Sequence, residues 1–186
     1  MQEIEIVKHF IERFENEFYI ENEQWDDSGK NRIDLIITHK QEGFQFGIEC
    51  KNGKTKKGTE VGNIVRQASR YSTANWNGNR IPIFLVPQLS KNVFVCPVEK
   101  IEIAHDVFIY KDRHHNDSIK DHTFNGFLGA FNVGEVRKLS HYGKRYGFLF
   151  SNQLIYESDT FNNYSYFHKN NYELLLNKIN NYDHIS

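Results

Sequence analysis

Residues 2–17 carry apolar side chains at steps of three and four, which is the period of an amphipathic helix. These apolar positions are Ile6, Val7, Phe10 and Phe14. An extended segment follows at 18–25, and residues 26–31 (DDSGKN) have the composition of a turn. The N-terminal part of the chain is therefore expected to form a helix, an extended segment and a turn.

Two apolar segments, 33–39 and 44–51, come next and are separated by a turn at 41–43. Their length and content predict two β-strands. A helix is expected from residue 59 to 76, where Asn77-Gly78-Asn79 stops it; its buried side would carry Val61, Ile64, Val65, Ala68 and Tyr71. Residues 81–86 (IPIFLV) are an almost uninterrupted apolar run, which favours a strand buried on both faces.

The second half of the chain has weaker patterns. We expect strands at 93–96 and 107–110, and a hairpin of strands 145–150 and 154–157 around residues 151–153. A last helix is predicted at 170–182, with Asn170 and Glu173 in the positions of a capping box. Its apolar stripe would be Tyr172, Leu175, Leu176 and Ile179. Together these elements predict an α/β fold with a central mixed β-sheet flanked by helices.

Composition favours one domain with a substantial core. The chain has 186 residues, of which 39% are hydrophobic and 15% aromatic. No run approaches the roughly 20 apolar residues that span a bilayer, and no signal peptide opens the sequence, so no membrane association is expected. Cys50 and Cys96 make no disulfide framework, which is typical of a reducing compartment. A cytoplasmic location is expected.

Charge is distributed unevenly although the formal net charge is only −1. Residues 1–50 contain twelve Asp/Glu and five Lys/Arg, whereas residues 51–80 contain seven Lys/Arg and one acid, Glu60. The basic residues of the second segment are Lys51, Lys54, Lys56, Lys57, Arg66, Arg70 and Arg80. Such a block suits a polyanion such as nucleic acid, and a solvated lysine loop is the alternative.

Asp34, Glu49 and Lys51 are the main candidates for a functional site. Side chains alternate across a strand, so Glu49 and Lys51 share one face while Cys50 points to the other. A hairpin would bring Asp34 against Glu49. Charged side chains are seldom buried unless they are paired or bind a metal, so this cluster predicts a metal and an anionic substrate. For Asp34 alone, a turn cap is the alternative.

Two helices add further candidates. Glu3 falls on the apolar side of the first helix; it either favours the helix dipole or projects toward Asp34 and Glu49. Gln67 and Tyr71 are four residues apart and so share a helix face. A glutamine on a buried side needs a polar partner, which a metal–phosphate site would supply. A surface glutamine next to a core tyrosine is the alternative.

This pattern resembles the PD-(D/E)XK nuclease superfamily, which includes restriction endonucleases, Holliday-junction resolvases and RecB-type nuclease domains. Asp34 matches the first acid, Glu49 and Lys51 match the (D/E)-x-K pair, and Ile33 replaces the motif's proline. Residues 3–10 (EIEIVKHF) are similar to the resolvase opening through Glu3, and Gln67 with Tyr71 to the RecB-like glutamine-x-x-x-tyrosine motif. The resemblance covers residues 2–96. It implies a restriction-endonuclease-like αβββαβ core within residues 1–104, with residues 105–186 forming a C-terminal α+β extension of unknown role packed on it.

The resemblance also implies metal-dependent hydrolysis of DNA phosphodiesters, with Mg²⁺ or Mn²⁺ as cofactor. Asp34, Glu49 and the backbone carbonyl of Cys50 would bind the metal, and Glu3 would complete a second metal site or hold a metal-bound water. Lys51 would orient the attacking water or stabilise charge on the phosphate. Gln67 would position Lys51 or a phosphate, with Tyr71 packed behind it. The residues expected to contact DNA are Lys54, Lys56, Lys57, Arg66 and Arg70.

Several alternatives stay open. The expected activity is that of a DNA endonuclease, which could belong to a defence or mobile-element system. It is expected to act as a homodimer or with a partner protein. A structure-specific resolvase and a catalytically silent DNA-binding or assembly subunit are the other functions considered. The histidine-rich segment 113–122 is read as a polar loop because it lacks the spacing of a metal site. Lys144 and Arg145 lie among aromatics, where a DNA-contact or dimer strand is the alternative to a core strand.

Overall fold

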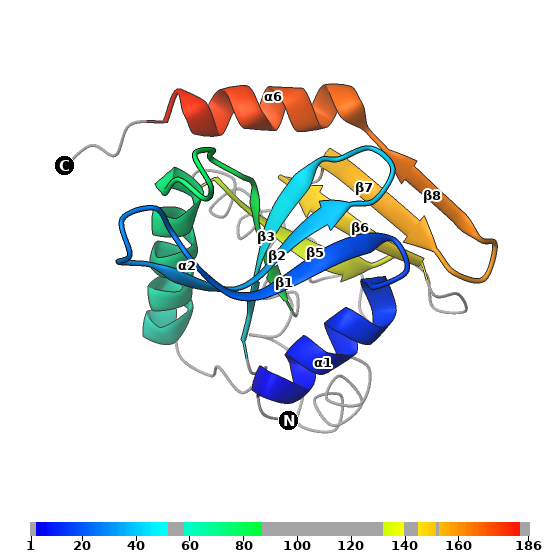
Figure 1. Ribbon diagram of the computed structural model, residues 1–186, viewed down its shortest axis with the longest axis horizontal. Coiled ribbons are helices and arrows are strands. Elements are labelled where there is room, and N and C mark those ends of the chain that lie inside the picture. The colour runs from blue at the N-terminus through cyan, green and yellow to red at the C-terminus, as the bar shows by residue number, and fades with distance from the viewer. Residues whose placement is uncertain (1–2, 52–57, 87–131, 140–144, 152, 183–186) are drawn as a thin grey trace.

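The computed structural model describes residues 3–51, 58–86, 132–139, 145–151 and 153–182. These residues form an α/β fold in which one mixed sheet of eight strands is combined with three helices (Figure 1). The elements are α1 (Glu3–Phe14), β1 (Phe18–Trp25), β2 (Arg32–His39), β3 (Gln45–Cys50), α2 (Gly58–Thr73), β4 (Ile83–Val86), β5 (Val133–Lys138), β6 (Arg145–Phe150), β7 (Gln153–Asp159), β8 (Tyr164–Phe167) and α6 (Lys169–Asn180).

The strands lie in the sheet in the order in which they occur in the chain, from β1 to β8. The pairs β1–β2 and β2–β3 are antiparallel, and the pairs β3–β4 and β4–β5 are parallel. The pairs β5–β6, β6–β7 and β7–β8 are again antiparallel. The sheet is strongly curled (Figure 1). The parallel strands β3, β4 and β5 are therefore central, with an antiparallel meander on each side.

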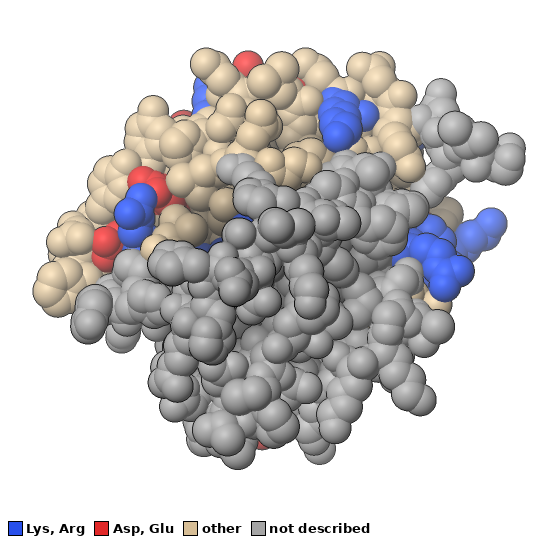
Figure 2. Space-filling view, turned by 180° about the vertical axis from the view of Figure 1, so that it is seen from behind, with Lys and Arg blue, Asp and Glu red and all other residues tan. Residues whose placement is uncertain are grey.

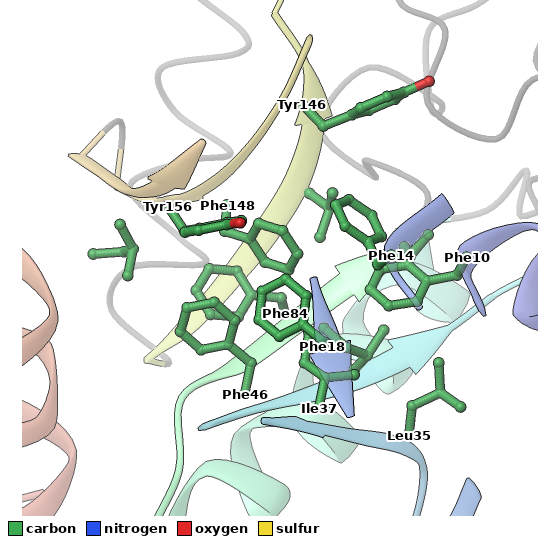
Figure 3. Close-up of a cluster of buried hydrophobic side chains, with 14 of the residues drawn as sticks. Phe10, Phe14, Phe18, Leu35, Ile37, Phe46, Phe84, Tyr146, Phe148 and Tyr156 are labelled. Carbon is green, nitrogen blue, oxygen red and sulfur yellow. The ribbon is translucent and has the colours of Figure 1, made fainter. Parts of the chain in front are cut away.

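One face of the sheet carries a core of aromatic side chains. Phe10 and Phe14 of α1, Phe18 of β1 and Phe148 of β6 belong to this cluster, and their rings converge in Figure 3. Ring centroids of Phe10 and Phe14 are 4.7 Å apart, and those of Phe14 and Phe148 are 5.4 Å apart. Leu175 and Ile179 of α6 join the same cluster. α1 and α6 therefore cover this face, which we call the aromatic face.

α2 covers the opposite face. Ile64, Ala68 and Tyr71 of α2 pack with Leu85 of β4 and Val133 of β5 in a second buried cluster. Alternation along β4 places Phe84 in the aromatic core and Leu85 under α2. β4 is thus buried on both faces, as its unbroken apolar run predicts. We call the side under α2 the α2 face.

A polar cluster joins α1 to β7 at the border of the aromatic core. The Tyr156 hydroxyl donates a hydrogen bond to Glu17 and lies 3.5 Å from His39 Nε2. Glu17 also accepts hydrogen bonds from Ser158 (2.7 Å) and from Arg13 (3.0 Å). Burial lowers the pKa of His39, and the charge of the nearby Glu17 offsets only part of this effect. These groups satisfy one another, which is what buried polar groups require.

The predicted elements of the first half are confirmed with small shifts of their ends. α2 ends at Thr73 rather than at residue 76, because the chain turns back there: the Trp76 indole donates to the Tyr71 carbonyl (3.0 Å). Asn77 and Gly78 have positive φ values (51° and 83°), and Trp76 pairs with Asn79 across the turn. The helix therefore ends three residues earlier than predicted.

In the second half, β6, β7 and α6 confirm the predicted hairpin and last helix. The capping box is wrong, because α6 begins at Lys169 after His168, whose side chain makes no capping hydrogen bond. The sequence pattern does not predict β5 or β8. The strands expected at 93–96 and 107–110 lie outside the described residues, as does the expected boundary at residue 104. β5 to β8 continue the sheet that β1 to β4 begin.

Among the described residues, the longest helix is too short and too polar to cross a bilayer.

Candidate functional site

β2 and β3 bring Asp34 and Glu49 together at one end of the sheet. The antiparallel register pairs Leu35 with Ile48, so the next pair along is Asp34 and Glu49. The backbone N–H of Cys50 donates a 2.7 Å hydrogen bond to Asp34 Oδ2, which fixes that carboxylate against the end of β3. The hairpin therefore places the two acids side by side, as the sequence predicts.

Glu49 and Lys51 share the α2 face and form an ion pair. Lys51 Nζ lies 2.5 Å from Glu49 Oε1, and the two side chains are only 16% and 2% exposed, respectively. Cys50 points the other way, into the aromatic core, where burial raises the pKa of its thiol. The Lys51 backbone N–H donates to the Val86 carbonyl (2.7 Å), so β4 also holds this end of β3.

The electrostatics of the cluster oppose ionisation of its acids. Burial raises the pKa of Glu49 to about 7, the Asp34 carboxylate adds to the rise, and Lys51 offsets only part of it. Burial also raises the pKa of Asp34, against the Cys50 hydrogen bond and Lys51. Burial lowers the pKa of Lys51, but the carboxylates of Glu49, Glu3 and Asp34 together outweigh this effect and raise it. A further positive charge at this site would therefore be strongly favoured.

The donor atoms fit a hard divalent cation. Glu49 Oε2 is buried and has no hydrogen-bond partner within the described part of the chain. This carboxylate oxygen beside Asp34 is therefore available as a metal ligand. Within the same residues, no three His, Cys, Asp or Glu side chains come close enough to form a metal-binding group. Mg²⁺ is commonly held by one or two carboxylates, with waters and substrate phosphates as the other ligands. Two carboxylates at this site satisfy that requirement.

α2 places Gln67 and Tyr71 near this cluster. Gln67 Nε2 donates a 2.6 Å hydrogen bond to the Tyr71 hydroxyl, as their four-residue spacing predicts. Tyr71 is buried against Trp76. Burial raises the pKa of Tyr71, and the charges of Glu49 and Asp34 add to the rise. Gln67 and Tyr71 therefore sit over the α2 face within electrostatic range of the acids.

Glu3 is the first residue of α1 and is exposed. Its negative charge nevertheless contributes to the raised pKa values of Asp34 and Lys51, behind the larger effects of burial. The start of α1 therefore lies near the cluster, although Glu3 does not complete a three-carboxylate group with Asp34 and Glu49. A metal-binding role for Glu3, like that of the Cys50 carbonyl, stays a prediction.

Three of the predicted DNA-contacting residues, Lys54, Lys56 and Lys57, lie outside the described residues. Arg66 and Arg70 are exposed on α2, and Arg66 donates to Asn63 Oδ1 (2.6 Å). On the face shown in Figure 2, the described Lys and Arg side chains form separate small groups rather than one continuous stripe.

Sequence reasoning does not single out Glu135 and Arg137 of β5, which form a buried ion pair on the α2 face. The sequence does contain a pattern that points to this pair, because Glu135-Val136-Arg137 repeats the acid-x-base spacing of Glu49-Cys50-Lys51. Of the other candidates, segment 113–122 and Lys144 lie outside the described residues, while Arg145 pairs with Glu157 at 2.7 Å. The neighbouring aromatics Tyr146, Phe148 and Phe150 are core residues.

No protein-family model, curated protein or solved structure is significantly similar to this chain.

Proposed function

We propose that this chain is a metal-dependent nuclease of the PD-(D/E)XK type that hydrolyses phosphodiester bonds within DNA. The main support for this proposal is one observation. Asp34, Glu49 and Lys51 converge on one face at the end of β3, and Glu49 Oε2 is a buried carboxylate oxygen without a partner in the described residues. A buried carboxylate of this kind is costly to a fold unless a cation balances it.

The order of the elements also supports the proposal. The chain runs α1-β1-β2-β3-α2-β4, and β4 lies parallel to β3 after the α2 crossover. This order is compatible with the αβββαβ core that the resemblance implies, with Asp34 on the second strand and Glu49 and Lys51 at the end of the third. Gln67 and Tyr71 lie on the helix that follows, where the RecB-like motif would place them.

Each side chain has a distinct task in the proposed reaction. A bound Mg²⁺ or Mn²⁺ would polarise the phosphate and lower the pKa of the attacking water. Asp34 and Glu49 supply hard oxygen donors, and the Cys50 N–H keeps the Asp34 carboxylate in place. Lys51 stays protonated because the nearby carboxylates raise its pKa against the effect of burial, and it would orient water or stabilise negative charge on the phosphate. Gln67 would position Lys51 or a phosphate, and Tyr71, whose hydroxyl accepts a hydrogen bond from Gln67, would pack behind it.

The test is a cleavage assay with Mg²⁺ or Mn²⁺ on linear, nicked, branched and single-stranded DNA. Wild-type protein should cleave at least one substrate, and a chelator should abolish cleavage. Asp34→Asn and Lys51→Ala should each lower the rate about 100-fold or more, since each removes a group that acts directly on the reacting phosphate. Glu173→Gln on α6, which alters an exposed carboxylate on the other side of the sheet, is the matched control and should leave cleavage unchanged.

The outcomes separate the competing functions. Cleavage that survives both substitutions would refute this assignment of the site. Junction cleavage that exceeds cleavage of linear duplex would identify a structure-specific resolvase. Tight metal-independent binding of DNA without cleavage of any substrate would instead identify a catalytically silent DNA-binding subunit.

A further inference from the structure

The ion pair of Glu135 and Arg137 stands level with that of Glu49 and Lys51 in the sheet. β4 pairs in parallel with β3 on one side and with β5 on the other. In this register Glu49 lies beside Leu85, and Leu85 lies beside Glu135. Two parallel strands thus carry the same acid-x-base spacing with their acids at the same level, on either side of β4.

Both pairs also point to the same side. Val133 belongs to the cluster under α2, whereas Val136 belongs to the aromatic core, so alternation along β5 puts Glu135 and Arg137 on the α2 face. Arg137 NH2 lies 3.1 Å from Glu135 Oε2, and the side chains are 16% and 2% exposed, the same values as for Lys51 and Glu49. In each pair, therefore, a buried acid holds the positively charged side chain two residues further along the chain.

Stability gives little reason for a second such pair. A buried ion pair often contributes no more to stability than apolar side chains of similar size. Leu85 occupies the position between the two acids and is fully buried, which shows that this row accepts an apolar residue. Glu135 does have a clear effect on its partner, because its carboxylate restricts where the guanidinium can lie.

We propose that Arg137 binds a phosphate of the nucleic acid next to the one at the Asp34–Glu49–Lys51 cluster, with Glu135 as its positioning residue. Adjacent strands are about 4.8 Å apart, so β3 and β5 are separated by roughly 10 Å, and Arg137 meets a different phosphate from Lys51. The planar guanidinium fork matches phosphate oxygens in a way that an ammonium group does not. This inference rests on the proposed nuclease function and names a further substrate contact for it.

The test measures binding apart from cleavage. A short fluorescently labelled DNA duplex is titrated with protein in chelator at a series of KCl concentrations, and anisotropy gives the Kd at each. Arg137→Gln should lose one phosphate contact. Its slope of log Kd against log salt should therefore be lower than that of wild type by about 0.9, and its Kd at low salt about 10-fold higher. Arg137→Lys should restore most of the slope. Lys169→Gln on α6 removes one exposed positive charge from the opposite side of the sheet and should leave the slope unchanged.

A double variant, Glu135→Gln with Arg137→Met, guards against misfolding, because it removes the pair without leaving a buried lone charge. It should show the same reduced slope as Arg137→Gln. A slope and Kd equal to those of wild type in both variants would overturn the inference, and the nuclease proposal would stand if wild type still cleaves. A reduced slope in a protein that cleaves nothing with Mg²⁺ would support the Arg137 contact and refute the nuclease proposal. Absence of any wild-type binding in chelator would overturn the Arg137 contact, whereas the cleavage assay with Mg²⁺ or Mn²⁺ decides the nuclease proposal.

Discussion

Replacing Glu49 by glutamine removes a carboxylate whose ionisation the folded protein opposes. Burial raises the pKa of Glu49 from 4.5 to about 7, with a further contribution from Asp34. A rise of this size corresponds to about 3 kcal/mol of free energy. Between these two pH values the folded protein keeps a proton that the unfolded chain has released. The free energy of unfolding therefore falls as pH rises through this window, and the loss is complete above about pH 7.

The assay is urea unfolding in chelator from about pH 4 to about pH 8, a range that brackets this window, for wild type and Glu49→Gln. Glutamine keeps the shape of the side chain and an oxygen that accepts from Lys51, but it does not ionise. Wild type should lose up to about 3 kcal/mol more than the variant across this range. Mg²⁺ at the upper end should restore the stability of wild type and not that of the variant, since an ion that binds only the folded state stabilises it.

Two stability profiles that run parallel with pH would refute this reasoning, because Glu49 would then titrate as it does in the unfolded chain. Equal stabilisation of both proteins by Mg²⁺ would place the ion elsewhere. Glu173→Gln serves as the control, since that carboxylate is exposed on α6 and should leave the wild-type profile unchanged.

Two further substitutions test how the sheet is held together, both by urea unfolding at neutral pH. Gly134→Ala would put a Cβ 2.5 Å from the ring of Phe84 and 2.8 Å from the Leu149 carbonyl oxygen. It should cost about 1–3 kcal/mol through overpacking, and an unchanged stability would contradict the close approach of β4, β5 and β6. Tyr156→Phe removes the hydroxyl that donates to Glu17 and should cost about 1–2 kcal/mol. Tyr164→Phe, at a side chain that is 46% exposed, is its control, and equal losses in the two variants would contradict the role given to the Glu17 cluster.

Much of the fold follows from local patterns. β2, β3 and β4 have runs of apolar residues because they lie inside the sheet, and α1 shows its buried face through Ile6, Phe10 and Phe14. β5 was missed because Gly134, Glu135 and Arg137 interrupt such a pattern. Its charges become buried only where the strand lies beside β4, a contact between segments far apart in the chain. β8 was missed because it is a short edge strand whose tyrosines are exposed.

The candidate site likewise has one part that local sequence patterns predict and another part that they do not. A short hairpin fixes the pairing of Asp34 with Glu49, and side-chain alternation puts Lys51 on the same face as Glu49, so sequence alone predicts this cluster. The depth of burial that leaves Glu49 Oε2 without a partner among the described residues depends on packing from several elements. The alignment of Glu135 with Glu49 depends on the long-range parallel register through Leu85. Neither is encoded in a local pattern.

The most direct test of the metal-site assignment is a crystal structure of the protein soaked with Mn²⁺, in which anomalous scattering locates the ion. We expect a peak between the Asp34 and Glu49 carboxylates, at direct-ligand distances of roughly 2.0–2.6 Å. A fully occupied Mn²⁺ site elsewhere in a protein that cleaves DNA, with no density between these two carboxylates, would contradict it.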